Sequence, residues 1–339
     1  MNIAALYQEL EQQTVRAGTA GTLERRIPTL SACDLFVGVQ KPSNSRSLRV
    51  RFSSGVAAQP QQVPKFRGLE IQQHSAVEDG REYLSVVLRA ANPAFGSVFT
   101  SLAEDVARHV GQIGDEGQAA GAFFGRLLQW QRLLERQGAE GLTPEEQRGL
   151  YGELWFLREH VIPALPLTEA VGAWTGPERT AKDFQFPGSA VEVKTTTARQ
   201  HQNLQITSEK QLDDAGLNAL FLCHLSLEAA QGTGESLPEI VAALRHSTGG
   251  SPLAAQSLED RLLEAGYLDV HGALYRAVGY LMREVNLYRV QDGFPRIVER
   301  DLLAGVGDVR YSISAAECRH HAASAEQMTT FMQGGSNER

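Results

Sequence analysis

The sequence has few cysteines and no long apolar run. Its 339 residues include three cysteines, Cys33, Cys223 and Cys318, and none of them belongs to a CxxC pair. This spacing argues against structural zinc and a disulfide framework, and a reducing cytoplasm is the expected compartment. No apolar run approaches the ~20 residues that cross a bilayer. The first residues lack the basic and apolar regions of a secretory signal. We therefore expect a cytoplasmic protein with no membrane partner.

Lysine is also scarce, and the chain as a whole is acidic. The formal net charge is −8 at pH 7, so any contact with nucleic acid must be local or helped by a partner subunit. Most cations are arginine, which suits phosphate. Abundant arginine with alanine and glycine is also typical of genomic composition, and we give that interpretation more weight. The lysines are Lys41, Lys65, Lys182, Lys194 and Lys210.

The remaining composition is that of an ordinary globular protein. Hydrophobic residues make up 42% and charged residues 21% of the chain, which excludes disordered, collagen-like and fibrous proteins. Short alternating runs separated by turn residues occupy about residues 27–91, and helical spacing follows them. We predict an α/β (α+β) protein with an N-terminal β-rich domain at 1–95, a helical connector at 96–142 and a third domain at 143–335.

Local patterns place several elements within these domains. Leu48, Val50 and Phe52 alternate with Arg49 and Arg51, which predicts a strand with one buried face. Apolar residues at helical spacing predict helices over 98–110 and about 120–136. A third helix is predicted over 143–160, because the sequence TPEE carries a capping threonine, a proline at the first helical position and a glutamate three residues after the cap.

The second half of the chain mixes strands and helices. KDFQF, AVEVKTTT, LQITS and NALFLCHLSL are strand candidates, and the last is apolar enough to be a buried central strand. Ser208 and Gln211 have the spacing of a helix cap and its partner, so we favour the start of a short helix over the alternative that they contact a functional site. ALYRAVGYL, VNLYRV and DVRYSIS read as later strands.

The segment 182–197, KDFQFPGSAVEVKTTT, can bring ionisable side chains together. Pro187-Gly188 is a turn dipeptide between two alternating runs, and a two-residue hairpin loop there would place Asp183 opposite Glu192. The two-residue period of a strand then puts Lys194 on the face of Glu192, and puts the intervening valines on the other face. The pairs predicted by this register are Phe186–Ser189, Gln185–Ala190, Phe184–Val191 and Asp183–Glu192.

Two opposed carboxylates with one ammonium suit phosphodiester hydrolysis. The carboxylates repel each other without a cation, and Mg²⁺ prefers carboxylate oxygens while keeping water ligands. Such an ion can polarise a phosphate oxygen and lower the pKa of a bound water. Lys194 can orient the attacking water or stabilise the developing charge. Asp183, Glu192 and Lys194 are therefore the candidate catalytic residues, with Asp183 and Glu192 on the metal.

A third carboxylate, Glu153, is a further candidate metal ligand. It lies on the apolar stripe of the predicted helix, where an unpartnered glutamate is rarely buried. Gly149 and Gly152 each cost about 1 kcal/mol relative to alanine in a helix interior. Their presence predicts that another part of the chain or a ligand comes close to this helix.

The helix glutamate Glu153, then Asp183, then Glu192-x-Lys194 resembles the PD-(D/E)XK nuclease superfamily, which has the restriction-endonuclease-like fold. GELWFL, KDF and VEVKTT are similar to an uncharacterised PD-(D/E)XK-motif family of bacterial restriction and phage-defence gene clusters. The resemblance covers about residues 143–227. It departs from the motif at Lys182, where the superfamily name has proline.

This resemblance implies a restriction-endonuclease-like αβββαβ core and cleavage of DNA with Mg²⁺, for which Mn²⁺ could substitute. It implies that Asp183 and Glu192 hold the metal, that Lys194 assists catalysis and that Glu153 is an accessory ligand. It also implies a restriction or phage-defence role, with DNA as substrate and other defence subunits as partners. The alternative is a catalytically silent nuclease fold that serves DNA binding or complex assembly. Arg276, Arg283 and Arg289 line a DNA cleft or are ordinary surface arginines, and both interpretations stay open.

Overall fold

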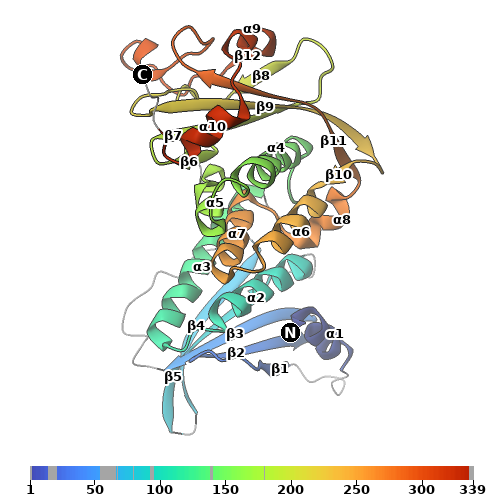
Figure 1. Ribbon diagram of the computed structural model, residues 1–339. Helices are drawn as coiled ribbons and strands as arrows, with labels where there is room; N and C mark the ends of the chain where they lie inside the picture. The colour runs from blue at the N-terminus through green and yellow to red at the C-terminus, as the bar shows by residue number, and fades with distance from the viewer. Residues whose placement is uncertain are drawn as a thin grey trace. The chain divides into compact units, whose positions relative to one another are not determined.

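The computed structural model is a mixed α/β protein made of two compact units (Figure 1). The first unit is Met1–Gly141 with Leu268–Val270, and the second is Leu142–Tyr267 with His271–Arg339. The structure describes residues 2–13, 21–53, 66, 68–78, 80–91, 95–137, 140–178 and 180–335. The α/β class expected from the sequence is confirmed. The domain boundaries at residues 95 and 142 stay predictions.

The first unit is built on an antiparallel sheet with the strand order β1-β2-β3-β5-β4. The alternation expected around residue 50 is present, because Leu48, Val50 and Phe52 are buried whereas Arg49 and Arg51 are half-buried on the other face. The strands are β1 (Gly21–Ile27), β2 (Asp34–Lys41), β3 (Ser45–Ser53), β4 (Leu69–Glu78) and β5 (Arg81–Ala90).

Three helices pack on the apolar face of this sheet (Figure 1). They are α1 (Ile3–Gln12), α2 (Gly96–Val110) and α3 (Glu116–Gln137). The predicted helix at 98–110 starts two residues earlier than expected, and the one at 120–136 starts four residues earlier. Both differences lie at helix N-termini, where apolar spacing is a poor guide.

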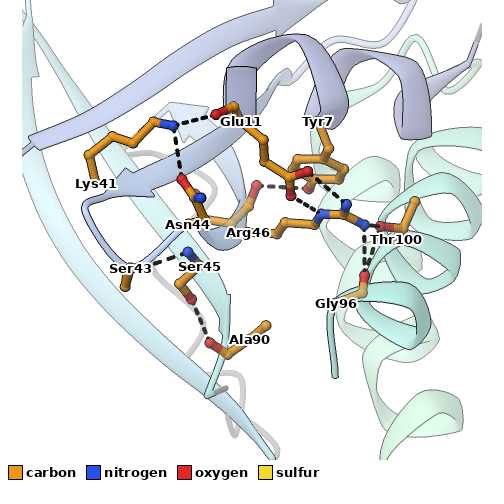
Figure 2. Close-up of polar contacts among 11 residues, drawn as sticks. Tyr7, Glu11, Lys41, Ser43, Asn44, Ser45, Arg46, Ala90, Gly96 and Thr100 are labelled. Atoms are coloured by element: carbon orange, nitrogen blue, oxygen red, sulfur yellow. Dashed lines mark hydrogen bonds and ion pairs between the residues drawn. The ribbon is translucent and has the colours of Figure 1, made fainter. Parts of the chain in front are cut away.

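Arg46 of β3 connects this sheet to two helices (Figure 2). Its Nε donates to Glu11 Oε1 of α1 at 2.7 Å, and its Nη1 donates to Thr100 Oγ1 of α2 at 2.6 Å and to the Gly96 carbonyl at 3.1 Å. The guanidinium also lies 5.2 Å from the centre of the Tyr7 ring. One half-buried arginine thus fixes α1 and the start of α2 on the same strand.

A buried ion pair joins α2 to α3. Asp105 accepts hydrogen bonds from Arg126 Nε at 2.6 Å, from Arg126 Nη2 at 2.7 Å and from Trp130 Nε1 at 2.7 Å. The Arg126 side chain is 1% exposed. Charges are rarely this deeply buried unless they are paired, so this contact fixes how the two helices pack.

The second unit is built on a sheet with the strand order β10-β11-β9-β7-β6. Strands β7 and β9 are parallel, and the other neighbours are antiparallel. The strands are β6 (Phe184–Phe186), β7 (Ser189–Thr196), β9 (Ala219–Gln231), β10 (Glu235–Ser236) and β11 (Val278–Val290). The predicted central strand, NALFLCHLSL, is β9 and is buried along most of its length.

Both faces of this sheet are covered, which gives the unit two apolar cores. One core lies between the sheet and its helices, and the other lies between the sheet and the antiparallel pair β8 (Asn203–Ile206) and β12 (Tyr311–Ser314) (Figure 1). The helices on the first side are α4 (Pro144–Phe156), α5 (Leu167–Ala173), α6 (Leu237–Thr248), α7 (Pro252–Ala265), α8 (Gly272–Tyr275) and α10 (Ala325–Met332), whereas α9 (Ala315–Cys318) contributes to the second core. Elements α4, β6, β7, β9, α6 and β11 follow the predicted αβββαβ order, with α5, β8, β10, α7 and α8 inserted between them.

In this unit, some of the local predictions agree with the structure and others do not. The capping box of α4 is present: Thr143 Oγ1 accepts from the Glu146 N–H, and the Glu146 carboxylate accepts from the Thr143 N–H. Two predicted strands, 273–281 and 285–290, are instead α8 followed by the single strand β11, which carries a bulge between Met282 and Glu284. The short helix predicted from Ser208 is wrong, because the backbone there forms only turns.

Candidate active site

The predicted hairpin at Pro187-Gly188 is confirmed. Its register pairs Phe184 with Val191, Gln185 with Ala190 and Phe186 with Ser189. Gly188 has φ 75°, a conformation that glycine adopts without the strain of a side chain. The turn chemistry and the alternating pattern of the two strands therefore set the register, as the sequence predicted.

The pairing stops before Asp183, which approaches β7 in a different way. Strand β6 begins at Phe184, and the Asp183 carboxylate accepts a hydrogen bond from the Val193 N–H at 2.7 Å. Asp183 thus uses its side chain to bond the edge of β7. Among the described strands, residues 192–196 of β7 pair only with β9, so this edge is open to a pocket.

Glu192 and Lys194 form a buried ion pair. The Lys194 Nζ lies 2.8 Å from Glu192 Oε1, and Glu192 is 1% exposed. The second carboxylate oxygen, Oε2, is buried with no hydrogen-bond partner among the described residues. A buried carboxylate oxygen without a partner is costly, so this atom is a position where a cation would be stabilised.

Glu153 reaches the same place from α4. Its Oε2 accepts a hydrogen bond from Trp174 Nε1 at 2.7 Å. A Cβ on Gly176 would lie 2.7 Å from that oxygen and 3.1 Å from Asp183 Oδ1. Glu153 and Asp183 therefore flank one point in the structure, and only a glycine at position 176 leaves room for both carboxylates.

The buried carboxylates carry raised pKa values. Burial, together with the neighbouring Asp183, raises the pKa of Glu192 to about 8, against the opposing attraction of Lys194. Burial and the neighbouring Asp183 raise the pKa of Glu153, and burial raises the pKa of Asp183 against the attraction of Lys194. Burial alone would lower the pKa of Lys194, but Glu192 and Asp183 raise it overall. Three buried carboxyl groups therefore surround the ammonium of Lys194, and this single positive charge does not balance three negative charges.

Glu153, Asp183, Glu192 and Lys194 line one pocket of about 430 Å³. In the described part of the chain, no group of three or more His, Cys, Asp and Glu side chains is placed to hold a metal ion as it stands. The donor set still suits a hard divalent cation, because Mg²⁺ is commonly held by one or two carboxylates and several waters. The unpartnered Glu192 oxygen and the raised pKa values both favour an added positive charge.

The pocket also contains Gln211 and Arg148, which are not among the predicted catalytic or metal-binding residues. Gln211 Oε1 accepts from Lys194 Nζ at 3.2 Å and from the Thr207 N–H at 2.8 Å. The sequence favours a helix-capping role for Gln211 over a contact with the site, but its side chain contacts the catalytic candidate Lys194. Arg148, five residues before Glu153 on α4, also lines the pocket. Its role depends on the packing of α4 against β7, so the local sequence does not indicate it.

The sequence leaves the roles of Arg276, Arg283 and Arg289 open, and the structure shows contacts of the Arg283 and Arg289 side chains with other parts of the chain. Arg283 donates to the carbonyls of Thr197 at 2.7 Å and Ala198 at 3.3 Å, and so holds the segment after β7. Arg289 lies over the Phe331 ring at 4.7 Å. Neither arginine, nor Arg276, is among the residues that line the pocket.

The two glycines of α4 have different surroundings. A Cβ on Gly152 would lie 2.4 Å from Thr195 Cγ2, so Gly152 allows the close approach of α4 and β7 that the sequence predicted. A Cβ on Gly149 would meet no described atom within 4 Å, and Gly149 lines the pocket. Gly152 therefore serves packing, whereas Gly149 leaves space.

This difference predicts opposite effects on stability. We expect Gly152→Ala to destabilise the protein by about 1–3 kcal/mol through overpacking. Gly149→Ala should stabilise it by about 0.5–1 kcal/mol through helix propensity. The measurement is the free energy of unfolding in urea for each variant. Shifts of the same sign in both variants would show that the packing of α4 against β7 differs from this structure.

No helix among the described residues is both long and apolar enough to cross a membrane. Searches of the curated proteins and of the solved structures returned no match. A family model does match: DUF4420, described as "Putative PD-(D/E)XK family member", covers residues 3–316 and so spans both compact units. With this match over most of its length, the chain belongs to the DUF4420 family of PD-(D/E)XK proteins.

Proposed function

We propose that this protein is a divalent-metal-dependent DNA endonuclease that acts in the cytoplasm as a component of a restriction or phage-defence system. The family supports a nuclease-like protein. The observation that carries the proposal is the gathering of Asp183, Glu192 and Lys194 at the open edge of β7, in one pocket with Glu153. The defence role, and partner subunits of such a system, rest on the resemblance to restriction and phage-defence families.

In this proposal Asp183 and Glu192 would hold Mg²⁺ or Mn²⁺, with Glu153 as an accessory ligand. The bound ion would polarise a phosphate oxygen and lower the pKa of a water molecule. Lys194, held by Glu192 and Gln211, donates to the negative charge that develops on the phosphate. Water attacks the phosphorus in line and gives up a proton to solvent, while the P–O bond to the leaving oxygen breaks and that oxygen takes up a proton, with no covalent enzyme intermediate.

The test is cleavage of supercoiled plasmid by the purified protein with Mg²⁺, Mn²⁺ or EDTA. We expect cleavage that needs the metal and falls by about 10²–10³ or more in Asp183→Ala and Lys194→Ala, because each removes a charged group from the reacting centre. Asp292→Ala is the matched control, because its side chain is 100% exposed and does not line the pocket.

The outcomes separate the two functional classes. Cleavage that persists in Asp183→Ala and Lys194→Ala would contradict the proposed site. Plasmid binding without cleavage by any of the proteins would favour the silent nuclease fold that serves DNA binding or assembly. A second readout is the melting temperature with and without Mg²⁺, which should rise for the wild-type protein and not for Asp183→Ala.

A further inference from the structure

Arg148 is an arginine with spare hydrogen-bonding capacity in the acidic pocket. Its Nε donates to Thr195 Oγ1 at 3.3 Å. Its Nη2 has only a long ion-pair contact, 4.0 Å from the Glu145 carboxylate, whose side chain is 82% exposed. Exposed pairs of this length contribute little. The paired terminal nitrogens, which suit a phosphate, have no hydrogen bond to a described residue.

The space beside Arg148 is empty because of its neighbour on α4. Gly149 lines the pocket, and a side chain there would meet no described atom within 4 Å. Residues 145, 148, 149, 152 and 153 share one face of the helix, so the absence of a side chain at 149 leaves a gap between the arginine and Glu153.

The edge of β7 supplies a backbone donor at this gap. The Val193 N–H points to the open edge, where Asp183 accepts it. Backbone groups of a strand alternate in direction, so the Thr195 N–H points to the same edge two residues further on, about 6.6 Å away. That interval is comparable to the spacing of successive phosphates in a DNA strand.

We propose that the Arg148 guanidinium and the Thr195 N–H bind the substrate phosphate next to the one that is cleaved. This inference rests on the proposed nuclease function and adds a second phosphate position to it. The arginine supplies the positive charge that the acidic chain must provide locally. Gly149 leaves room for the sugar-phosphate backbone, and Glu145 competes for the guanidinium until the phosphate displaces it.

The experiment compares Arg148→Gln, Arg148→Lys and Glu145→Gln with wild-type protein on a short DNA duplex. Loss of one charged phosphate contact should raise KM about 10-fold to 100-fold in Arg148→Gln, with a smaller change in kcat. Arg148→Lys should be intermediate because it keeps the charge and loses the fork. Glu145→Gln should lower KM. Arg300→Gln, which removes a charge outside the pocket, is the matched control.

A binding measurement keeps the test independent of cleavage. In an Asp183→Ala background, Arg148→Gln should weaken duplex binding. It should also reduce the slope of the logarithm of the binding constant against the logarithm of the salt concentration by about one. Gly149→Leu should weaken binding with no change in charge or salt slope. Equal KM values and salt slopes for Arg148→Gln and Arg300→Gln would overturn this inference and leave the proposed nuclease standing. A wild-type protein that neither cuts nor binds DNA would overturn both.

Discussion

Glu192→Gln is expected to make the metal-free protein more stable at pH 8 and to abolish cleavage. The wild-type site buries Glu153, Asp183 and Glu192 around the single ammonium of Lys194. Glutamine removes one of the crowded acids, so the remaining charges are closer to balance. It also removes a proposed metal ligand, so we expect a loss of activity of about 10²-fold or more.

The pH dependence of stability follows from the direction of the shift. The pKa of Glu192 is about 8 in the folded protein, whereas an unperturbed glutamate has a pKa of about 4.3. Between these values the folded state holds a proton that the unfolded state has lost. The contribution of Glu192 to the free energy of unfolding is therefore fully present below pH 4. It falls by about 1.4 kcal/mol per pH unit as the pH rises to 8. The raised pKa values of Glu153 and Asp183 act in the same direction.

The measurement is the free energy of unfolding between pH 5 and pH 8.5, with and without Mg²⁺. Glu192→Gln should flatten the pH profile and lose the stabilisation by Mg²⁺ that the wild-type protein shows at pH 8. The control is Glu228→Gln, which changes a half-exposed glutamate of β9 that forms an ion pair with Arg199. This variant should keep the wild-type pH profile and the stabilisation by Mg²⁺. If Glu192→Gln retained the wild-type pH profile, the repulsion between Glu192 and the other two buried carboxylates would not contribute to stability.

Asp105→Ala is expected to destabilise the first compact unit by about 3–5 kcal/mol, because it leaves the buried Arg126 without its carboxylate. Asp105 accepts from Arg126 and from Trp130 Nε1, so alanine also leaves an indole N–H without a partner. The measurement is urea unfolding followed by the fluorescence of Trp130, read against the same substitution in a Trp130→Phe protein.

A double variant separates the ion pair from packing. Asp105→Leu with Arg126→Met replaces both charges by apolar side chains, and we expect it to recover much of the loss because neither charge is left alone. If Asp105→Ala cost less than about 1 kcal/mol, Arg126 would be stabilised by its other contacts, such as Gln129 at 2.9 Å.

The hairpin could be predicted from the sequence because its information is local. Pro187-Gly188 and the alternation of FQF with SAVEV specify a turn and a register, and the structure has that register. The opposition of Asp183 to Glu192 could not be extended in the same way. Strand pairing ends at Phe184, and the position of Asp183 depends on the distant Trp174–Gly176 segment, whose backbone bonds to it.

The roles of other residues at the site depend on contacts between distant segments, which local spacing does not determine. Gln211 has the spacing of a capping partner, but its side chain bonds Lys194 across 17 residues. Arg148 is recognisable only once α4 packs on β7 through Gly152. Glu153 was identified as unusual because an acid on an apolar stripe conflicts with burial, and its partner Trp174 could not be inferred from helical spacing.

The short length of β6 has a consequence for the behaviour of the protein in solution. Because β6 is short, residues 192–196 of β7 have no neighbouring strand on that side among the described strands. An unpaired strand edge can pair with a strand of another molecule, and proteins often prevent this with charged side chains. Here Asp183 caps one backbone donor of β7, and Glu192 and Lys194 place buried charge on the same strand. The residues that we assign to cleavage would thus also discourage self-association. Replacing all three with apolar residues should therefore favour aggregation.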